Sequence, residues 1–136
     1  MERPAERRGG ALVGFVIVFF GAGLGGAARH AVNLAAARLL GTAFPFGTLA
    51  VNILGSMLMG LIAGWFAFKG DASQHWRLFL TTGILGGFTT FSAFSLDIAL
   101  LWERHDLLAL LTYVSTTFIV SVASLMAGLL LMRQVL

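Results

Sequence analysis

The chain has 136 residues, of which 58% are hydrophobic and only 11% are charged. Soluble domains carry roughly 25% charged residues, so this composition indicates a protein of the lipid bilayer. A bilayer core requires roughly 20 apolar residues per helix, so four crossings would use most of the length and leave no room for a soluble catalytic domain. Because the chain has no cysteine, disulfides and thiolate chemistry are excluded.

The formal net charge of +3 does not indicate a nucleic-acid partner. The arginines stand in tails and loops beside apolar segments, where contact with lipid headgroups explains them better. Residues 1–10 form a basic tail, and the apolar run that follows continues past the length of a signal peptide. We therefore expect a single all-α integral membrane domain over residues 1–136.

The first predicted membrane span covers residues 11–28. Gly21 and Gly25 in its second half are four residues apart, a spacing that lets two helices pack closely. Arg29 then marks a membrane interface, where its side chain can extend toward the headgroups or pair with another group. Residues 31–40 are helical in composition but too short to span, which predicts a separate piece at the membrane surface.

Three further spans are predicted at residues 48–68, 77–101 and 107–132. Apart from the basic tail, the basic residues are balanced between the two sides of the membrane. The chain could therefore insert both ways and form an antiparallel homodimer, although a single orientation set by the tail is equally compatible with the charges.

The third span contains a segment at residues 83–97 that is poorly suited to an uninterrupted membrane helix. Its three glycines, two adjacent threonines, two serines and one aspartate are unusual in hydrocarbon. Irregular backbone is tolerated there only where it is buried in protein or lines a wet cavity, and a broken helix exposes carbonyls and helix ends to an ion. The segment predicts a broken third helix in a protein that conducts or carries a small ion.

Neutral polar side chains in the second and fourth spans have two interpretations. Asn52 could bond across helices as a structural contact, or its NH2 group could donate to an anion without a charge that would trap it. Tyr113, Thr117 and Ser121 are spaced four apart and so lie on one ridge. Their hydroxyls could bond carbonyls of their own helix or form a track that replaces the water of a hydrated ion.

Phe88, Phe91 and Phe94 recur every three residues, which predicts a shared face of the third helix. Such a stripe is more often packing, but the positive ring edges can also hold a small anion weakly, as conduction requires. Asp97 is expected at the interface, although a carboxylate so close to the membrane is often functional. No metal-ligand cluster or nucleophile–base arrangement is visible, so we do not expect an enzyme.

Three stretches together resemble the CrcB/Fluc family of fluoride channels, which are small four-helix bacterial membrane proteins. They are residues 21–29 (Gly-Ala-Gly-Leu-Gly-Gly-Ala-Ala-Arg), residues 45–60 with their Gly47-Thr48-Leu49, Val51-Asn52 and Gly55 core, and residues 83–95. The sequence Gly-Gly-Phe-Thr-Thr-Phe-Ser-Ala-Phe-Ser in the last stretch is highly specific to that family. The resemblance covers essentially the whole chain.

The resemblance implies an antiparallel, dual-topology homodimer in the bacterial inner membrane, with two pores that export fluoride passively from the cytoplasm and relieve its toxicity. It also implies a structural sodium ion at the two-fold axis, held by the backbone carbonyls of Gly86 and Thr89. An arginine after the first glycine-rich stretch is typical of the family, and here it is Arg29. The pore residues that the resemblance implies are Asn52, Phe91, Phe94, Tyr113, Thr117 and Ser121, with Thr90 and Ser92 as candidate neighbours.

Two positions depart from the family pattern. The family often has glutamate where this chain has Asp97. Leu125 stands where the fourth-helix track would continue, so either Ser124 replaces the missing hydroxyl or the track ends at Ser121. The alternative functions are a small dual-topology proton-coupled exporter that uses Asp97, and a non-transporting assembly subunit. The exporter would need a carboxylate deep within a span, and the subunit would leave the helix break without a purpose.

Overall fold

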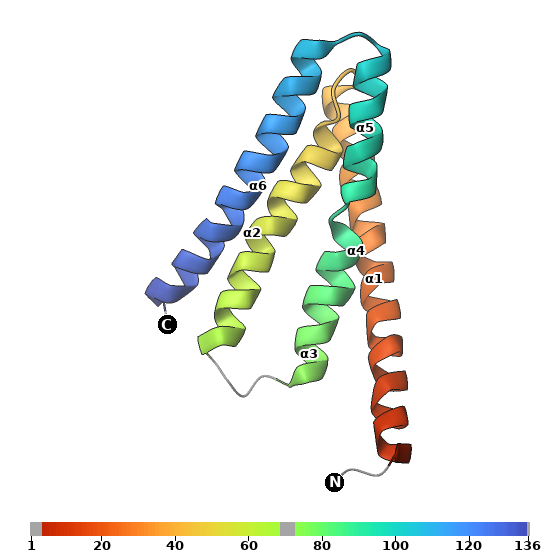
Figure 1. The fold of residues 1–136 in the computed structure, drawn as a ribbon, viewed down its shortest axis with the longest axis vertical. Helices are drawn as coiled ribbons and strands as arrows, with labels where there is room; N and C mark the ends of the chain where they lie inside the picture. Colours follow the sequence, from red (N-terminus) through yellow and green to blue (C-terminus); the bar gives the residue numbers. More distant parts are fainter. Residues whose placement is uncertain (1–3, 69–72, 136) are drawn as a thin grey trace.

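The computed structural model describes residues 4–68 and 73–135, and all the regular structure in these ranges is helical. The elements are α1 (Pro4–Leu40), α2 (Phe46–Phe68), α3 (Gln74–Leu78), the π-helix η1 (Phe79–Leu85), α4 (Gly86–Phe88), α5 (Phe91–Glu103) and α6 (Leu107–Val135). In Figure 1, α1 and the series α3–η1–α4–α5 run upward, whereas α2 and α6 run downward. The start of α1 and the end of α6 therefore lie toward the same end of the molecule.

Four helical stretches are long and apolar enough to cross a membrane, namely Gly9–Leu40, Phe46–Phe68, Gln74–Glu103 and Leu107–Val135. Many large apolar side chains on them point outward, among them Phe15, Leu108 and Phe118. The buried hydrophobic core is small and consists of Val51, Leu85, Phe88, Leu101 and Tyr113. Such a large exposed apolar surface is typical of contact with lipid. The predicted set of four long apolar helices, with the third one broken, is confirmed.

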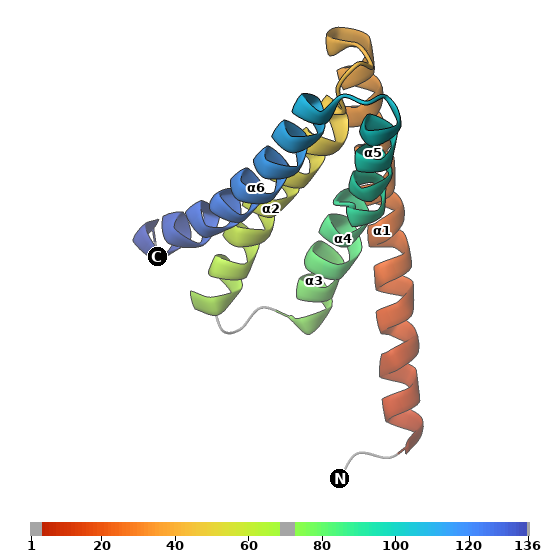
Figure 2. The same ribbon diagram turned by 45° about the horizontal axis from the view of Figure 1, so that its top comes forward.

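The first helix is longer than the sequence analysis predicted. α1 continues without interruption through Arg29 and His30 to Leu40, so residues 31–40 extend this helix and are not a separate surface piece. Arginine and histidine do not break helices, and the alanines and leucines that follow favour helix strongly. The helix ends at Gly41, whose φ of +81° suits glycine and whose N–H donates to the Ala37 carbonyl at 3.1 Å. Figure 2 shows this end of α1 projecting beyond the α5–α6 connection.

Close contact between glycines joins α1 to the first half of the third span. A Cβ on Gly21 would lie 2.8 Å from the Cα of Gly83, and a Cβ on Gly25 would collide with the Ile84 carbonyl. Side chains larger than hydrogen at these positions would force the two helices apart. The packing role predicted for Gly21 and Gly25 is confirmed.

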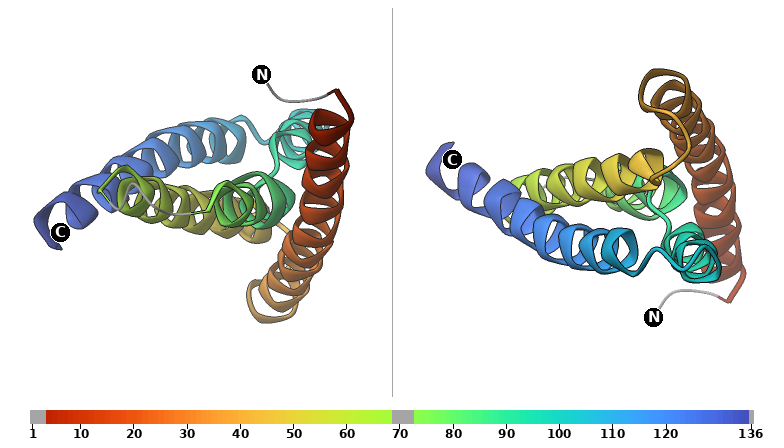
Figure 3. Two further views of the ribbon diagram at one scale, coloured as in Figure 1. Left: turned by 90° about the horizontal axis from the view of Figure 1, so that it is seen from below. Right: turned by 90° about the horizontal axis from the view of Figure 1, so that it is seen from above.

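A second close pair consists of α2 and α6. A Cβ on Gly60 would collide with the Leu125 carbonyl, and a Cβ on Gly128 would lie 2.6 Å from the Met57 carbonyl. Both views of Figure 3 show α2 and α6 side by side, with α1 inclined along the other side of the molecule. The fold therefore consists of two tightly packed helix pairs, and Figure 1 shows them diverging toward its lower end.

The break in the third span lies at Thr89 and Thr90. These residues have extended backbone, with φ and ψ of −75° and 157° for Thr89 and of −153° and 120° for Thr90. The Thr90 hydroxyl accepts from the Ala93 N–H at 3.1 Å and so caps the start of α5. The glycines of the segment remain helical, and Gly83 and Gly87 lie against α1. The predicted break is present, but the threonines form it.

The connection between α5 and α6 contains a non-glycine residue in the left-handed region, His105, with a φ of 56°. A Cβ raises the energy of this conformation by about 1–2 kcal/mol, whereas glycine adopts it freely. We expect His105→Gly to raise the midpoint of thermal unfolding, by an amount that reflects about 1 kcal/mol. Thermal unfolding of the purified protein in detergent checks this, with His75→Gly as a control at an exposed helical position. An unchanged or lowered midpoint for His105→Gly would contradict it.

Candidate functional site

An open groove with a volume of about 390 Å³ lies at the break of the third span. It is bounded by α2, by the break and the start of α5, and by the middle of α6. Its lining residues are Asn52, Gly55, Ser56, Met59, Thr89, Thr90, Phe91, Phe94, Thr117, Phe118, Ser121, Val122 and Leu125. None of these residues carries a charge. The groove thus combines neutral polar groups with aromatic and aliphatic walls.

Two hydroxyls in this groove have no hydrogen-bond partner among the described residues. They are Thr117 Oγ1 and Ser121 Oγ, and both atoms are buried. Side chains at these positions could have bonded the carbonyls of their own helix, but they do not. A buried hydroxyl without a partner destabilises a fold by about 1–3 kcal/mol, so a partner from outside the folded chain is expected for such groups. A ligand that forms hydrogen bonds with them would be such a partner.

Asn52 forms two hydrogen bonds with a single residue of the break. Its Oδ1 accepts from the Thr90 N–H at 2.9 Å, and its Nδ2 donates to the Thr90 carbonyl at 3.1 Å. The interpretation of Asn52 as a contact between helices is therefore confirmed. An amide nitrogen carries two hydrogens, so one remains beyond the bond to Thr90.

The aromatic residues of the third span do not share one face. Phe88 precedes the break and is buried in α4, whereas Phe91 and Phe94 follow it in α5 and line the groove. The ring centroids of Phe91 and Phe94 are 5.7 Å apart, and that of Phe94 lies 5.3 Å from that of Tyr113. The predicted stripe of three was wrong, because the extended residues between Phe88 and Phe91 interrupt the helical period.

Tyr113 is fully buried and its hydroxyl donates to Asp97 Oδ2 at 2.9 Å. Tyr113 does not line the groove, so its hydroxyl is not continuous with those of Thr117 and Ser121 there. Asp97, which the sequence analysis expected at the interface, is partly exposed and accepts this bond. The ridge predicted from the spacing is thus divided between two environments.

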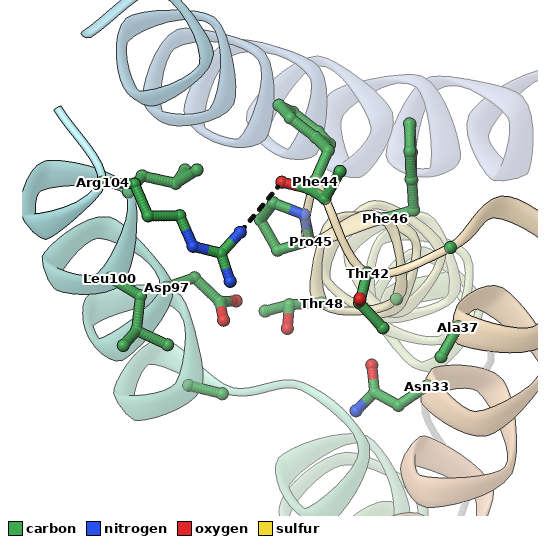
Figure 4. Close-up of a pocket in the computed structure, with 15 residues that line it drawn as sticks. Asn33, Ala37, Thr42, Phe44, Pro45, Phe46, Thr48, Asp97, Leu100 and Arg104 are labelled. Atoms are coloured by element: carbon green, nitrogen blue, oxygen red, sulfur yellow. Dashed lines mark hydrogen bonds between the residues drawn. The ribbon is translucent and has the colours of Figure 1, made fainter. Parts of the chain in front are cut away.

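Asp97 lines a second cavity of about 360 Å³, near the α1–α2 and α5–α6 connections. Figure 4 shows the side chains of Asn33, Thr48, Asp97 and Arg104 directed into this cavity. Arg104 Nη1 donates to the Ala43 carbonyl at 3.3 Å, which ties α5 to the α1–α2 connection. The charged residues that line the two cavities, Asp97 and Arg104, are thus confined to the second one.

The remaining predicted residues lie as follows. Ser92 is exposed and does not line the groove, but its hydroxyl lies 3.2 Å from that of Thr90. Leu125 lines the groove and Ser124 does not, so the hydroxyls end at Ser121. Arg29 is partly exposed on α1 and lines neither cavity.

The backbone carbonyls of Gly86 and Thr89 are not bonded as they would be in a continuous helix. The Thr90 N–H donates to Asn52 and not to the Gly86 carbonyl four residues earlier, and Thr89 is extended, so its own carbonyl lies outside the helix. Gly86 is also exposed, and a Cβ there would have only the Thr81 carbonyl nearby, at 3.6 Å. Free carbonyl oxygens suit a hard monovalent cation. Within residues 4–68 and 73–135, no cluster of three or more His, Cys, Asp or Glu could hold a metal ion.

Sequence reasoning missed some of the groove. Met59 lies seven residues after Asn52 and three after Ser56, so helical periodicity would have placed it on the same face of α2. The Thr89 side chain and Phe118 have no such signal. Thr89 could be placed only once the position of the break was known, and Phe118 only from the rotation of α6 against α5.

Taken together, the fold and the groove define a small polytopic membrane protein with an uncharged polar site beside a broken helix. A family model described as "CrcB-like protein, Camphor Resistance (CrcB)" matches residues 16–129. The chain is 54% identical over 120 residues to the "Fluoride-specific ion channel FluC 2" of Nitrobacter hamburgensis, which covers 88% of this chain and 97% of the relative. It is 58% identical over 119 residues to the "Fluoride-specific ion channel FluC" of Methylobacterium nodulans, which covers 88% and 95% respectively.

The chain therefore belongs to the CrcB/FluC family of fluoride-specific ion channels. This is a family of membrane transport proteins and not of enzymes.

Proposed function

We propose that this protein is a fluoride-selective channel that lets fluoride leave the cytoplasm passively and so relieves its toxicity. Relatives that are more than half identical over most of their length carry the name of a fluoride-specific channel. The observation that carries the proposal is the uncharged groove with two buried, unpartnered hydroxyls, Thr117 and Ser121. A small anion is the ligand that such donors are suited to bind.

The groove would replace the water around fluoride with several weak contacts. The Thr117 and Ser121 hydroxyls and the remaining hydrogen of Asn52 can each donate to the ion. The edges of the Phe91 and Phe94 rings are positive and add a weak attraction. Because no lining residue is charged, the ion would be bound weakly enough to leave again, which conduction requires.

Two copies of the chain, related by an antiparallel two-fold axis, would complete two pores. In the single chain the groove is open and Phe91 is 79% exposed, so a second subunit has an apolar surface to cover. The balance of basic residues on the two sides, apart from the basic tail, is compatible with dual topology. In such a homodimer each groove would become an enclosed path, one for each subunit.

A sodium ion at the two-fold axis would stabilise this dimer. The carbonyls of Gly86 and Thr89 fit it, since the first has lost its helical partner, the second lies in extended backbone, and Gly86 is on the surface of the chain. Sodium would supply a fixed positive charge that satisfies carbonyls from both broken helices. Its role here is structural.

The exporter alternative would place a proton-carrying carboxylate in the transport path. Asp97 lies outside the groove, in the second cavity, and accepts a hydrogen bond from Tyr113. The groove itself has no titratable side chain. These positions favour the channel over the exporter, and the conduction test below separates the two.

Fluoride efflux from liposomes that contain the purified protein tests the function. We expect rapid release of fluoride and little release of chloride, without a requirement for a proton gradient. Absence of fluoride release from an assembled dimer would contradict the channel. Fluoride release that depends on a proton gradient and on Asp97 would favour the exporter.

Phe94→Ile should reduce fluoride efflux by about 5-fold, since it removes an aromatic edge worth roughly 1 kcal/mol and leaves a differently shaped wall. The dimer should still form, because isoleucine keeps an apolar side chain on the surface that the second subunit covers. Phe15→Ile is the matched control, since Phe15 is 75% exposed on α1 and lines neither cavity. Equal efflux from Phe94→Ile and the wild type would show that the ring does not contribute to the pore.

A further inference from the structure

The helix break leaves a largely buried peptide segment at Thr90. Thr90 is 7% exposed and its backbone is extended, so its N–H and carbonyl lie outside the regular bonding of α4 and α5. Buried backbone groups without partners destabilise a fold strongly, and more so where lipid excludes water. The break can persist only if another part of the chain bonds these two groups.

Asn52 on α2 supplies both partners at once. Its carboxamide presents an acceptor to the Thr90 N–H at 2.9 Å and a donor to the Thr90 carbonyl at 3.1 Å, as a neighbouring strand would. Of the residues of this size, only asparagine offers a donor and an acceptor on one planar group. Aspartate retains the acceptor alone, and leucine retains the size but neither partner.

A second contact from the same face of α2 holds the preceding residue. A Cβ on Gly55 would collide with the Thr89 methyl group, so this methyl occupies the space above Gly55. Gly55 follows Asn52 by three residues and therefore lies on the same side of the helix. One face of α2 thus fits two consecutive residues of the break, Thr89 by shape and Thr90 by hydrogen bonds.

We propose that Asn52 is a positioning residue that fixes the helix break and the start of α5, in addition to any contact with an ion. We call the two hydrogen bonds between Asn52 and Thr90 the clamp. The Thr90 hydroxyl also caps α5 through the Ala93 N–H, so the residue held by the clamp sets where α5 begins. Phe91 and Phe94 stand in the first turn of that helix, and their placement in the groove depends on the same clamp. The clamp itself is independent of the proposed function, and only its effect on conduction rests on it.

Hydrogen–deuterium exchange of the assembled protein in detergent tests the clamp, read on peptides that cover residues 86–94. We expect Asn52→Leu to speed exchange of the Thr90 amide by about 10-fold or more, because its acceptor is lost. Asn52→Asp keeps the acceptor for the Thr90 N–H but loses the donor to the Thr90 carbonyl, so this amide should exchange more slowly than in Asn52→Leu and faster than in the wild type. Ser56→Ala, one turn further along α2, is the matched control for exchange and should leave the Thr90 amide as protected as in the wild type, because Ser56 is not hydrogen-bonded to Thr90.

The order of the two variants separates a clamp from general packing. A residue that mattered only for packing would make the buried charge of Asn52→Asp more disruptive than the apolar Asn52→Leu. The proposal is overturned if Asn52→Leu assembles and leaves Thr90 exchange unchanged, or if Asn52→Asp exchanges faster than Asn52→Leu. If Asn52→Leu does not assemble, Asn52→Ser, which is too short to bond both Thr90 groups, takes its place in the same comparison.

Fluoride efflux by the wild-type protein is measured on the same preparations. Its absence would contradict the proposed channel and leave the exchange comparison valid. Normal efflux together with unchanged Thr90 exchange in Asn52→Leu would contradict the clamp and leave the channel intact.

Discussion

Replacing Thr117 with valine is expected to lower fluoride efflux by about 10-fold or more without a loss of stability. Valine has nearly the same shape as threonine, and the hydroxyl that it removes is buried without a partner in the folded chain. Removal of an unsatisfied buried hydroxyl relieves a cost of about 1–3 kcal/mol, so the thermal midpoint should stay the same or rise. Efflux from liposomes and thermal unfolding in detergent measure the two effects.

The adjacent Thr116 provides the control for this variant. It lies on the same turn of α6 but does not line the groove, so Thr116→Val should leave efflux unchanged. A fall in both efflux and stability for Thr117→Val would indicate that the hydroxyl has a structural partner in the dimer. Unchanged efflux would remove Thr117 from the ion path.

Gly25→Ala is expected to lower stability by about 3 kcal/mol, the upper end of the usual range for an overpacked site. The added methyl would collide with the Ile84 carbonyl and lie 2.8 Å from the Phe88 amide nitrogen, and both are backbone atoms that cannot rotate away. Separation of α1 from the third span would also displace the residues before the break. The midpoint of thermal unfolding and the yield of assembled protein measure the loss.

Gly23→Ala is the matched control on the same helix. A Cβ on Gly23 meets nothing within 4 Å, and alanine is the better helix former by about 1 kcal/mol, so stability should stay the same or rise. Similar losses for Gly23→Ala and Gly25→Ala would mean that α1 tolerates neither for a reason other than contact with the third span.

Features that depend on local sequence were predictable. Hydropathy gave the number of long apolar helices, and the spacing of Gly21 and Gly25 gave the packing face of α1. The first helix was predicted to end too early, because Arg29 was interpreted as a membrane boundary. A helix can continue beyond such a boundary. Composition indicates which residues prefer lipid and which prefer water. The continuity of a helix depends instead on its backbone hydrogen bonds, and in α1 these continue as far as Gly41.

Features that depend on contacts between distant residues were only partly predictable. Asn52 and Thr90 are 38 positions apart in the chain, and nothing in their local sequence pairs them. The same is true of Tyr113 and Asp97, whose bond removes one hydroxyl from the predicted track. The type of each residue indicated polar contact in an apolar setting, but the partner follows only from the packing of α2 and α6 against the broken span.

The π-helix before the break has a consequence for how this chain can change in length. The turns of η1, Phe79–Leu85, enclose one residue more per hydrogen-bonded loop than those of an α-helix. If one residue were lost from η1, the remaining residues could form an α-helix. Thr89, Thr90 and α3 would then keep their present orientations. The same loss in α6 between Tyr113 and Thr117 would rotate the residues beyond it by about 100° relative to Tyr113, so the Thr117 and Ser121 hydroxyls could not keep their present direction. Deletions accumulated over evolution should therefore be tolerated in η1 and eliminated from α6.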